Sequence, residues 1–425
     1  MDLLLVQEIL KKHMNNKYSS VFIATFSQYE KGIRMPRNGM IEQLIYFFLP
    51  KVKILLLLDQ PHPVSDSINP IIELYREGEL RKKSSISSFF YFPIYFFCKM
   101  RTRNRTRISY KLRDFFSVIF SAFRVGGEYD LFIGLEAINL LAGLFLKKLG
   151  KVKTVVYYVS DYSPTRFGKT LFNSMYLALD RFCVTRADFT WDVSPAMKKG
   201  RIEAGLTQGD LKRVLHVPNA LFPSQIKSLP IAKRIPNRLV YMGALYPEFG
   251  SDLAIEALRE VKKQIPDAVL HVIGGGDGLE RLKNLAKKLS LEKSVVFYGF
   301  VEDNNEMAKI VRNSYLGLAP YRAGDTSSRW YGWYGDAGKI RQYVASGLPV
   351  VTTQVPPLGA HIVGKGAGIM TKDTIKDFSD GIMKLLSDHT SYAKLTNAAE
   401  KISKDNTWEN VYSKALRDMK NLNRQ

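Results

Sequence analysis

The sequence predicts an α/β protein built of two doubly wound domains, and two observations support that prediction. The chain has 425 residues, more than one hydrophobic core usually supports, and 46% of them are apolar, so each half can bury a core. Short apolar runs alternate with helical patterns along almost the whole chain, which is typical of parallel strands covered by helices. We expect a first domain over residues 1–218 and a second over 219–405, and a C-terminal helix over 406–423 can pack back on the first.

The predicted strands form two series separated by a linker. The first series covers residues 20–26, 52–58, 130–134, 153–159, 189–193 and 213–217, and the second covers residues 238–243, 268–273, 295–300, 315–319 and 349–353. Between them, residues 216–239 hold four prolines and show no clear period. Such a segment is typical of a linker that enters a new domain.

A basic segment stands out in the first half. The net charge is +22, which favours a polyanionic partner. Residues 98–113 hold seven basic residues and follow an aromatic run at 89–98. One interpretation is a membrane anchor whose aromatic side chains enter the headgroup region while Arg101, Arg103, Arg105 and Arg107 meet lipid phosphates. The other is a solvated loop or helix face packed on its own domain. No nucleic-acid recognition motif accompanies the charge, so we expect no nucleic-acid partner.

The sequence predicts no membrane-spanning segment and no metal. The aromatic run is far shorter than the roughly 20 residues of a spanning helix and contains Pro93. The first 14 residues place an acid before the apolar stretch and lysines after it, the wrong order for a secretory signal. Cys98 and Cys183 offer neither a disulfide framework nor metal-ligand spacing. We expect a cytoplasmic protein that can lie at the inner face of the cell membrane and that uses no cofactor.

A glycine-rich loop lies between a predicted strand and a predicted helix. In HVIGGGDGLERLKNLAKKL, residues 271–289, the glycines are Gly274, Gly275, Gly276 and Gly278. Glycine lets a ligand approach the main chain, and free amides at a helix N-terminus attract anions. The spacing fits neither the dinucleotide fingerprint nor the P-loop. The loop is therefore either a phosphate site or a plain structural turn.

A second glycine-bounded helix lies within YGDAGKIRQYVASGLPVVTT, residues 334–353. Asp336 is placed to cap this helix, Gly347 to end it in a left-handed conformation, and Pro349 to open the next strand. Lys339 then falls in the first turn and Gln342 one turn later on the same face. The lysine can neutralise a phosphate and the glutamine can bind a sugar hydroxyl. The alternative for Lys339 is an ordinary exposed helix lysine.

Several segments resemble, in order, landmarks of the glycosyltransferases with the GT-B fold, especially the retaining enzymes of family 4, the glycosyl transferases group 1. These segments are HVPNALF, LVYMGAL, HVIGGGDGLERL, VVFYGFVEDNNEMAKIVRNSYLGLAPY and KIRQYVASGLPVV. The resemblance covers residues 213–353 well and is weaker before them. It implies two Rossmann-like domains facing across a cleft, and transfer of a sugar from a nucleotide diphosphate donor to a saccharide or lipid-linked acceptor.

The resemblance also implies where the donor binds. The glycine loop, Gly274 to Gly276, would face the diphosphate together with Lys339 and Gln342. The nucleobase would pack near the segment of Gly299, Phe300 and Val301. Apart from the resemblance, Arg322 and Arg329 in the neighbouring loop are candidates to help offset the diphosphate charge, and the favoured alternative for both is an ordinary surface loop arginine.

The chain departs from the family pattern at several donor positions. Two glutamates separated by seven residues are usual there, but this chain has Tyr334 and Gln342. The arginine and lysine that usually follow the opening strand of the second domain are replaced by Ala244 and Phe249. With both cations missing, we expect Lys339 and helix dipoles to offset the diphosphate charge.

Two acids follow strands of the first domain and are candidates for acceptor chemistry. Glu136 follows the strand at 130–134 and Asp161 follows the strand at 153–159. Either can orient or deprotonate an acceptor hydroxyl. The structural alternatives are a helix cap for Asp161 and a first-turn acid for Glu136. The family commonly has a histidine near Ser160, which is absent here, and His62 is a weaker substitute.

Two other functions remain open at the level of sequence. A nucleotide-sugar epimerase of the same fold would need no acceptor pocket. A scaffold that has lost catalysis and serves in surface-polysaccharide assembly would explain the replaced donor residues.

Overall fold

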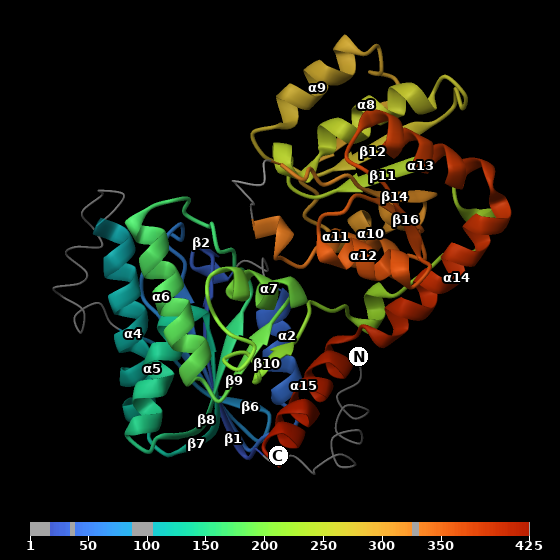
Figure 1. Cartoon of the computed structure of the whole chain (residues 1–425). Coiled ribbons are helices and arrows are strands. Elements are labelled where there is room, and N and C mark those ends of the chain that lie inside the picture. The colour runs from blue at the N-terminus through green and yellow to red at the C-terminus, as the bar shows by residue number, and fades with distance from the viewer. Residues whose placement is uncertain (1–17, 35–38, 87–104, 325–330, 425) are drawn as a thin grey trace.

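The computed structural model describes residues 18–34, 39–86, 105–324 and 331–424, and these fold around two sheets (Figure 1). The N-terminal sheet has eight strands in the order β10-β9-β8-β7-β1-β4-β5-β6. Its elements are β1 (Ser20–Ser27), β2 (Tyr29–Glu30), β3 (Ile33–Arg34), α2 (Gly39–Phe48), β4 (Ile54–Pro61), β5 (Ile71–Arg76), β6 (Glu79–Ser85), α4 (Arg105–Val125), β7 (Tyr129–Leu135), α5 (Glu136–Lys148), β8 (Val152–Val159), α6 (Leu171–Arg186), β9 (Phe189–Asp192), α7 (Pro195–Glu203) and β10 (Val214–His216), with β2 and β3 forming a separate hairpin.

The C-terminal sheet has six strands in the order β13-β12-β11-β14-β15-β16, and all its pairs are parallel. Its elements are β11 (Arg238–Met242), α8 (Ser251–Val261), β12 (Val269–Ile273), α9 (Leu279–Lys288), β13 (Val295–Gly299), α10 (Asn304–Arg312), β14 (Leu316–Ala319), α11 (Gly338–Ala345), β15 (Val350–Thr352), α12 (Pro357–Gly364), β16 (Gly368–Met370) and α13 (Ile375–Ser387), followed by α14 (His389–Asp405) and α15 (Trp408–Leu422). The predicted strands of both series are confirmed, and no strand end differs from its prediction by more than three residues.

One edge of the N-terminal sheet differs from the prediction. Strand β5 pairs antiparallel with β4, and β6 pairs antiparallel with β5, whereas a parallel sheet was expected throughout. The reason is visible in β6, whose residues are almost all exposed and include Arg81, Lys82 and Lys83. A charged edge strand lacks the apolar run on which the prediction relied, and such charges protect an edge from pairing with other chains.

Both sheets reverse strand order at a defined point. In the C-terminal sheet, β12 and β13 lie on one side of β11, and β14 to β16 lie on the other. In the N-terminal sheet, β4 lies on one side of β1 and β7 to β10 on the other. Ligands of doubly wound sheets bind outside the carboxyl ends of the strands at such switch points. The strand order therefore predicts ligand binding at the loops after β11 and β14 and at those after β1 and β7.

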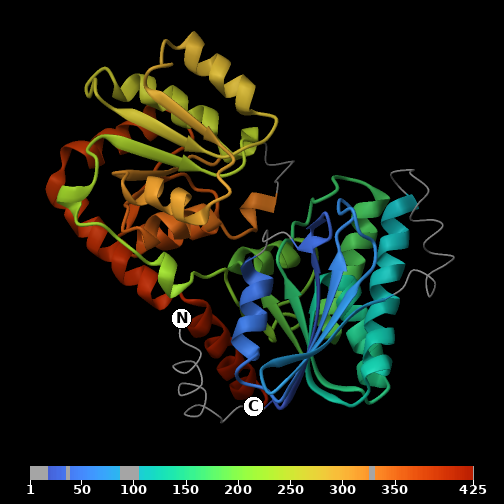
Figure 2. The same cartoon turned by 180° about the vertical axis from the view of Figure 1, so that it is seen from behind.

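The last helix joins the two halves of the molecule. After α14 has run along the C-terminal domain, α15 lies against the N-terminal domain (Figure 2). Tyr412 stacks on Trp408 and Trp191, and its hydroxyl donates to the carbonyl of Met40 at 3.0 Å. Trp408, Tyr412 and Met419 are buried in the N-terminal core. Burial of these large side chains anchors the end of the chain to the first domain.

A buried ion triad holds the α6, β9 and α7 region together. Arg201 is fully buried, its Nε donates to Asp180 at 2.8 Å, and its Nη1 pairs with Asp192. The guanidinium also lies over the ring of Tyr162, 4.7 Å from its centre. Arg201 is the cation that both carboxylates share, so removing the arginine would leave two buried acids without their cation.

Candidate donor and acceptor site

Lys339 lies in the first turn of α11 and is 8% exposed. Its Nζ lies 4.2 Å from the ring centre of Tyr241, 4.6 Å from that of Tyr321 and 5.1 Å from that of Phe249. We call these three rings the aromatic cage. Nζ has no hydrogen-bond partner among the described residues. The interpretation of Lys339 as an ordinary exposed lysine is therefore wrong.

The aromatic cage buries the amine of Lys339 and so changes its pKa. Ring faces attract a cation but provide no hydrogen-bond acceptor. Burial accordingly lowers the pKa of Lys339 to about 7. An amine held in this way can take a proton and pair with an anion that enters the site.

The cage is assembled at the switch point of the C-terminal sheet. Tyr241 belongs to β11, Phe249 ends a 3-10 helix after β11, and Tyr321 follows β14. The tyrosine of β11 is fixed by its hydroxyl, which donates to the carbonyl of Ala244 at 3.0 Å. Gly243 leaves room for the lysine, because a methyl group there would lie 3.1 Å from Nζ. The ammonium thus lies at the carboxyl end of the central strand.

The glycine loop packs against the same turn after β11. A methyl group on Gly274 would lie 1.9 Å from the carbonyl oxygen of Gly243, and one on Gly278 would lie 1.9 Å from that of Leu245. For these two glycines, close packing between two loops is the physical reason for a missing side chain. Gly276, at φ 125°, has only the amide of Leu245 within 4 Å of such a methyl group. Lys339 and the glycine loop are therefore brought together around Gly243.

The residues expected near a nucleobase follow β13. Gly299 ends that strand at φ 69°, with nothing within 4 Å of a side chain built on it. Phe300 is 72% exposed, and a methyl group on Gly275 would lie 3.3 Å from its Cβ. Val301 packs against the core that contains the start of α11. An exposed ring beside the glycine loop is a surface on which a planar base can stack.

Asp336 does not cap α11, contrary to the prediction. The helix begins at Gly338 after Ala337, without a side-chain cap. Asp336 instead pairs with Arg341 at 2.7 Å and accepts a hydrogen bond at 2.8 Å from the amide of Asn219. It thereby ties the segment between the domains to α11. Gly347, at φ 71°, ends the helix as predicted, and Gln342 is half-buried one turn after Lys339.

Arg322 is engaged elsewhere, which argues against its predicted role as a phosphate helper. Its guanidinium lies 3.3 Å from Asp252 and 3.2 Å from Glu256, both on α8, and donates to the carbonyl of Asp373 at 3.1 Å. Two carboxylates already neutralise this cation. Arg329 lies outside the described residues.

Tyr334 takes a structural role at the position where the resembled family carries its first glutamate. Its hydroxyl donates to Glu203 at 2.7 Å, and its ring meets that of Tyr162 edge-on at 6.4 Å. A methyl group on Gly200 would lie 2.7 Å from this ring. Tyr334 is therefore buried in the N-terminal core and connects the loop before α11 to α7.

On the acceptor side, the structure brings both predicted acids to the carboxyl ends of β7 and β8. Glu136 opens α5 at φ 66°, a strained conformation for a residue with a side chain, and accepts from the hydroxyl of Ser160 at 3.0 Å. Asp161 pairs with Arg166 at 2.8 Å. Asp161 caps no helix, because α6 is capped by Thr170.

The two acids differ in how their charge is compensated. Burial raises the pKa of Glu136, and Arg166 and Lys111 oppose that rise. Burial also raises the pKa of Asp161, against the lowering effect of Arg166. Since Asp161 is directly paired and Glu136 has only a hydroxyl donor, Glu136 is the better placed of the two to take up a proton. His62 packs beside Phe26, 6.1 Å between ring centres, and burial lowers its pKa.

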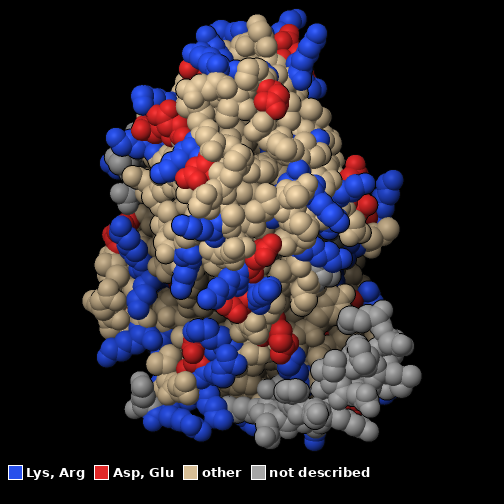
Figure 3. Space-filling model, turned by 90° about the vertical axis from the view of Figure 1, so that its right-hand side faces the viewer, with Lys and Arg blue, Asp and Glu red and all other residues tan. Residues whose placement is uncertain are grey.

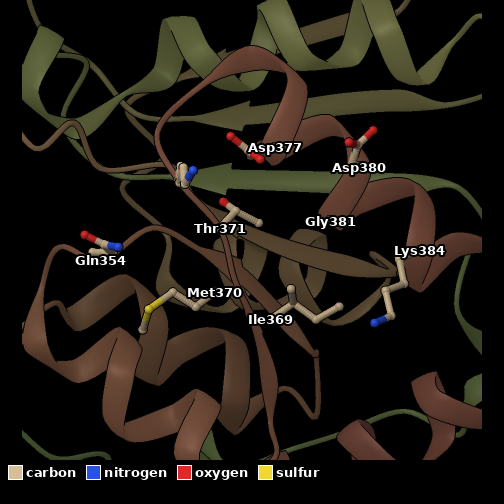
Figure 4. A pocket seen from close by; sticks show the side chains of 9 residues that line it. Gln354, Ile369, Met370, Thr371, Asp377, Asp380, Gly381 and Lys384 are labelled. Carbon is tan, nitrogen blue, oxygen red and sulfur yellow. The ribbon is translucent and has the colours of Figure 1, made fainter.

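The described residues also line a cavity of about 470 Å³ that contains none of the predicted site residues. It lies beyond β16, between Gln354, Thr371 and α13 (Figure 4). Asp377 and Asp380 project from α13 along this cavity. Lys372 and Lys384 line the cavity as well, so its ammonium groups and carboxylates are equal in number and no excess positive charge favours a diphosphate there.

Two further features concern metals and membranes. Among the residues that the structure describes, no group of three or more histidines, cysteines or acids could hold a metal ion. None of the helices within the described ranges combines the length and the apolar character needed to cross a bilayer.

The arginines predicted to meet lipid phosphates are only partly described. Arg101 and Arg103 lie outside the described ranges, and Arg105 and Arg107 belong to the first turn of α4, where only the backbone is described.

Comparison with known proteins identifies the second half of the chain. The model of the family described as Glycosyl transferases group 1 matches residues 225–402. The matched region spans most of the C-terminal domain, which is therefore similar to glycosyl transferases group 1. It contains the aromatic cage, the glycine loop and α11, so the geometry described above lies almost wholly inside the matched region.

Relatives and solved structures agree with this assignment. An uncharacterized glycosyltransferase of Haemophilus influenzae is 24% identical over 273 residues, which are 63% of this chain and 70% of that protein. HepE of Anabaena, solved in complex with UDP, has a TM-score of 0.64 at 15% identity and aligns with 96% of this chain and 100% of its own. The lipopolysaccharide outer core galactosyltransferase WaaB has a TM-score of 0.60 at 14% identity, over 93% of this chain and 99% of its own. The chain therefore has the GT-B fold, and the region that matches glycosyl transferases group 1 lies in the second of its two Rossmann-like halves.

Proposed function

We propose that this protein transfers a sugar from a nucleoside diphosphate sugar to a saccharide or lipid-linked acceptor at the cytoplasmic face of a membrane. The observation that carries the proposal is the buried amine of Lys339, which has no hydrogen-bond acceptor among the described residues and lies at the carboxyl end of β11 beside the glycine loop. The match to glycosyl transferases group 1 supports sugar transfer as the reaction class. HepE was solved with UDP, which makes uridine diphosphate the first donor fragment to test.

In this proposal the donor diphosphate lies between the glycine loop and the N-terminus of α11. The protonated amine of Lys339 pairs with the phosphate oxygens, and the first amides of α11 add the partial positive charge of a helix N-terminus. The bond between the sugar C1 and the β-phosphate oxygen breaks, and the nucleoside diphosphate leaves with the electron pair. A buried cation stabilises that developing charge more than a solvated one would.

The acceptor hydroxyl would attack C1 from the N-terminal domain. Its oxygen forms the new bond to C1, and its proton passes to a base. We assign that role to Glu136, with Asp161 and Arg166 orienting the acceptor. Transfer with retention of configuration is the stereochemistry that the family resemblance favours.

Two observations support an acceptor at a membrane. The arginine-rich segment of residues 98–107 leads directly into α4. One of the structural neighbours, WaaB, is named as a lipopolysaccharide outer core galactosyltransferase.

Calorimetric titration of the full chain with UDP and GDP tests the donor half of the proposal. We expect one nucleotide to bind and Lys339→Met to weaken that binding at least tenfold. Lys283→Met is the matched control, because Lys283 lies exposed on α9 in the same domain. If neither nucleotide binds the unaltered protein, the inactive scaffold becomes the better explanation. Nucleotide release that depends on added acceptor separates transfer from epimerisation.

A further inference from the structure

Helices α4, α5 and α6 lie side by side on one face of the N-terminal sheet (Figure 1). Their outer side is unusually apolar for a surface. The exposed large apolar side chains there are Leu112, Phe116 and Phe123 of α4, Phe145 of α5, and Leu171, Phe172, Met175 and Phe182 of α6. The most exposed of them, Leu171, keeps 79% of its surface accessible. Single exposed apolar residues are ordinary, but a group shared by three neighbouring helices marks an interaction surface.

The apolar residues follow helical spacing. Leu112, Phe116 and Phe123 lie on one stripe of α4, and Leu171, Met175 and Phe182 lie on one stripe of α6. Stripes of this kind normally face a core. Here the opposite sides of the helices already face the sheet, where Val118 and Ala122 of α4 are buried. The outer stripes therefore remain available for something outside the described chain.

The charges on the three helices are sorted by sign. Their acids are Asp114, Glu136 and Asp180. Asp114 is paired with Arg113 at 2.6 Å. Glu136, at the start of α5, accepts a hydrogen bond from Ser160, and Asp180 is buried against Arg201. No acid of these three helices is exposed, and Glu128, three residues after the end of α4, is the exposed acid next to them.

The cations, in contrast, lie outside. Exposed basic residues on or next to these helices are Lys111, Arg124, Lys148, Lys169, Arg181 and Arg186. Two of them lie against rings: Arg124 is 5.7 Å from the ring centre of Phe120 and Arg186 is 5.5 Å from that of Phe182. The half-buried Lys151 is 5.7 Å from the ring centre of Phe123. Cations and aromatic rings thus share one outer surface.

The opposite side of the molecule does not show this sorting. Figure 3 views the side on which α14 and α15 lie, and there basic and acidic side chains are interspersed. Exposed pairs such as Lys376 with Asp380 and Lys414 with Asp418 are examples. The segregated face is therefore a local property of α4, α5 and α6 and not a simple result of the net charge of +22.

We propose that the outer face of α4, α5 and α6 is a docking surface for a bilayer of anionic phospholipids. Aromatic and aliphatic side chains can enter the acyl boundary while lysines and arginines meet the phosphates. A second copy of the chain fits the face poorly, because two such faces would bring like charges together. The proposal deepens the membrane part of the proposed function, and it uses residues distinct from those of the donor site.

Sedimentation of the full chain with lipid vesicles tests the proposal. The probes are phosphatidylcholine vesicles with and without phosphatidylglycerol. One variant carries Phe123→Ser, Leu171→Ser and Phe182→Ser, and a second carries Arg124→Gln, Lys148→Gln and Arg186→Gln. The matched control carries Val296→Ser, Ile375→Ser, Lys283→Gln and Lys376→Gln, which are exposed positions of the C-terminal domain.

We expect the unaltered protein to bind the anionic vesicles, both face variants to lose at least tenfold in partitioning, and the control to stay within twofold. UDP affinity should be the same in all four proteins, so failure of this proposal is distinguishable from failure of the donor proposal. Unchanged partitioning of both face variants would overturn the docking proposal. The same holds if neutralising Arg101, Arg103, Arg105 and Arg107 abolishes vesicle binding while both face variants still bind, because the arginine segment would then account for the attachment. A third outcome would also overturn the docking proposal. If the protein binds no vesicles but associates with itself in a concentration-dependent way, and the apolar variant does not, the face belongs to a second copy of the chain.

Discussion

The ring centre of Phe249 lies 5.1 Å from Nζ of Lys339. Phe249 stands where the resembled family usually carries a donor-binding lysine, and Lys339 supplies an ammonium to the same place from α11. The two residues therefore look like a compensating pair, in which the cation has moved to the helix and the aromatic ring holds it. A double-mutant cycle measures such coupling.

We predict that Lys339→Met lowers UDP affinity at least tenfold and that adding Phe249→Lys restores most of that loss. Phe249→Lys alone should destabilise the fold, because it places two ammonium groups in one buried site. Calorimetry on the four proteins of the cycle provides the measurement. If the double variant binds no better than Lys339→Met, the pair does not compensate.

Donor binding should depend on pH through the same lysine. Burial lowers the pKa of Lys339 to about 7, so raising the pH above 7 removes the charge that the diphosphate needs. UDP affinity should therefore fall between pH 7 and pH 9, and binding in that range should take up a proton. Calorimetry in buffers of different ionisation enthalpy detects the uptake. Lys339→Met should show neither effect.

The stability of the unliganded protein should rise with pH over the range in which UDP affinity falls. A lysine whose folded pKa lies below its ordinary value of 10.5 destabilises the fold increasingly as pH falls from 10.5 to 7, and fully below 7. Lys339→Met should thus raise the free energy of unfolding by about 2–4 kcal/mol at pH 6 and by little near pH 10. Urea unfolding at the two pH values tests this. An equal gain at both would show that charge burial is not the cause.

The close contact between loops at Gly278 provides a prediction about stability. Gly278→Ala should cost about 2–4 kcal/mol, because the added methyl group would lie 1.9 Å from the Leu245 carbonyl oxygen. Gly338→Ala is the control, since nothing lies within 4 Å of a side chain there. Its unfolding midpoint in urea should stay close to that of the unaltered protein. Similar midpoints for both variants would contradict the packing role of the loop.

Arg201→Met should destabilise the N-terminal domain by about 3–5 kcal/mol, because it leaves Asp180 and Asp192 buried without their cation. Burial already raises the pKa of Asp192 to about 6. Arg201 lowers this pKa, so in Arg201→Met it should rise further, and the loss should shrink as the pH falls, beginning above pH 6, because protonation removes the unpaired charge. Thermal unfolding of Arg201→Met and of the exposed neighbour Arg181→Met, compared at pH 5 and pH 8, measures both effects. A pH-independent loss would argue for packing alone.

Glu136→Gln should lower kcat of sugar transfer about 10²–10⁴-fold while leaving UDP affinity unchanged, as expected for loss of a general base. Ser160→Ala should shift the acidic limb of the pH profile upward, because the serine hydroxyl stabilises the charged carboxylate at 3.0 Å. Asp161→Asn should act mainly on KM for the acceptor. A larger loss of kcat in Asp161→Asn than in Glu136→Gln would reverse the assigned roles.

The regular part of the fold could be predicted because its signals are local. Each apolar run that was taken as a strand, such as 238–243, is a strand of the structure. The antiparallel strands β5 and β6 were missed: β6 is a polar edge strand that buries too little to produce a pattern, whereas β5 is largely buried and was overlooked. The end of α11 at Gly347 could also be predicted, because a left-handed residue after a helix favours glycine.

The interpretation of single polar residues from sequence was less successful. Asp336 was expected to cap its own helix, but it bonds the amide of Asn219, which is 117 residues away along the chain. Arg322 was a candidate helper at the phosphates beside the favoured surface-arginine interpretation, and in the structure it pairs with Asp252 and Glu256 of α8. Partners so distant along the chain cannot be predicted from the spacing of neighbouring residues.

The sequence by itself determined the two series of parallel strands, the glycine loop and the position of Lys339 at the start of a helix, because these follow from periodicity and from backbone preferences of single residues. Only the tertiary structure decided that Lys339 is buried among three aromatic rings, that Gly274 and Gly278 pack against a neighbouring loop, and that the charges of α4, α5 and α6 are sorted between inside and outside. Those properties depend on which distant segments meet when the sheets form, and burial and charge compensation exist only after they have met.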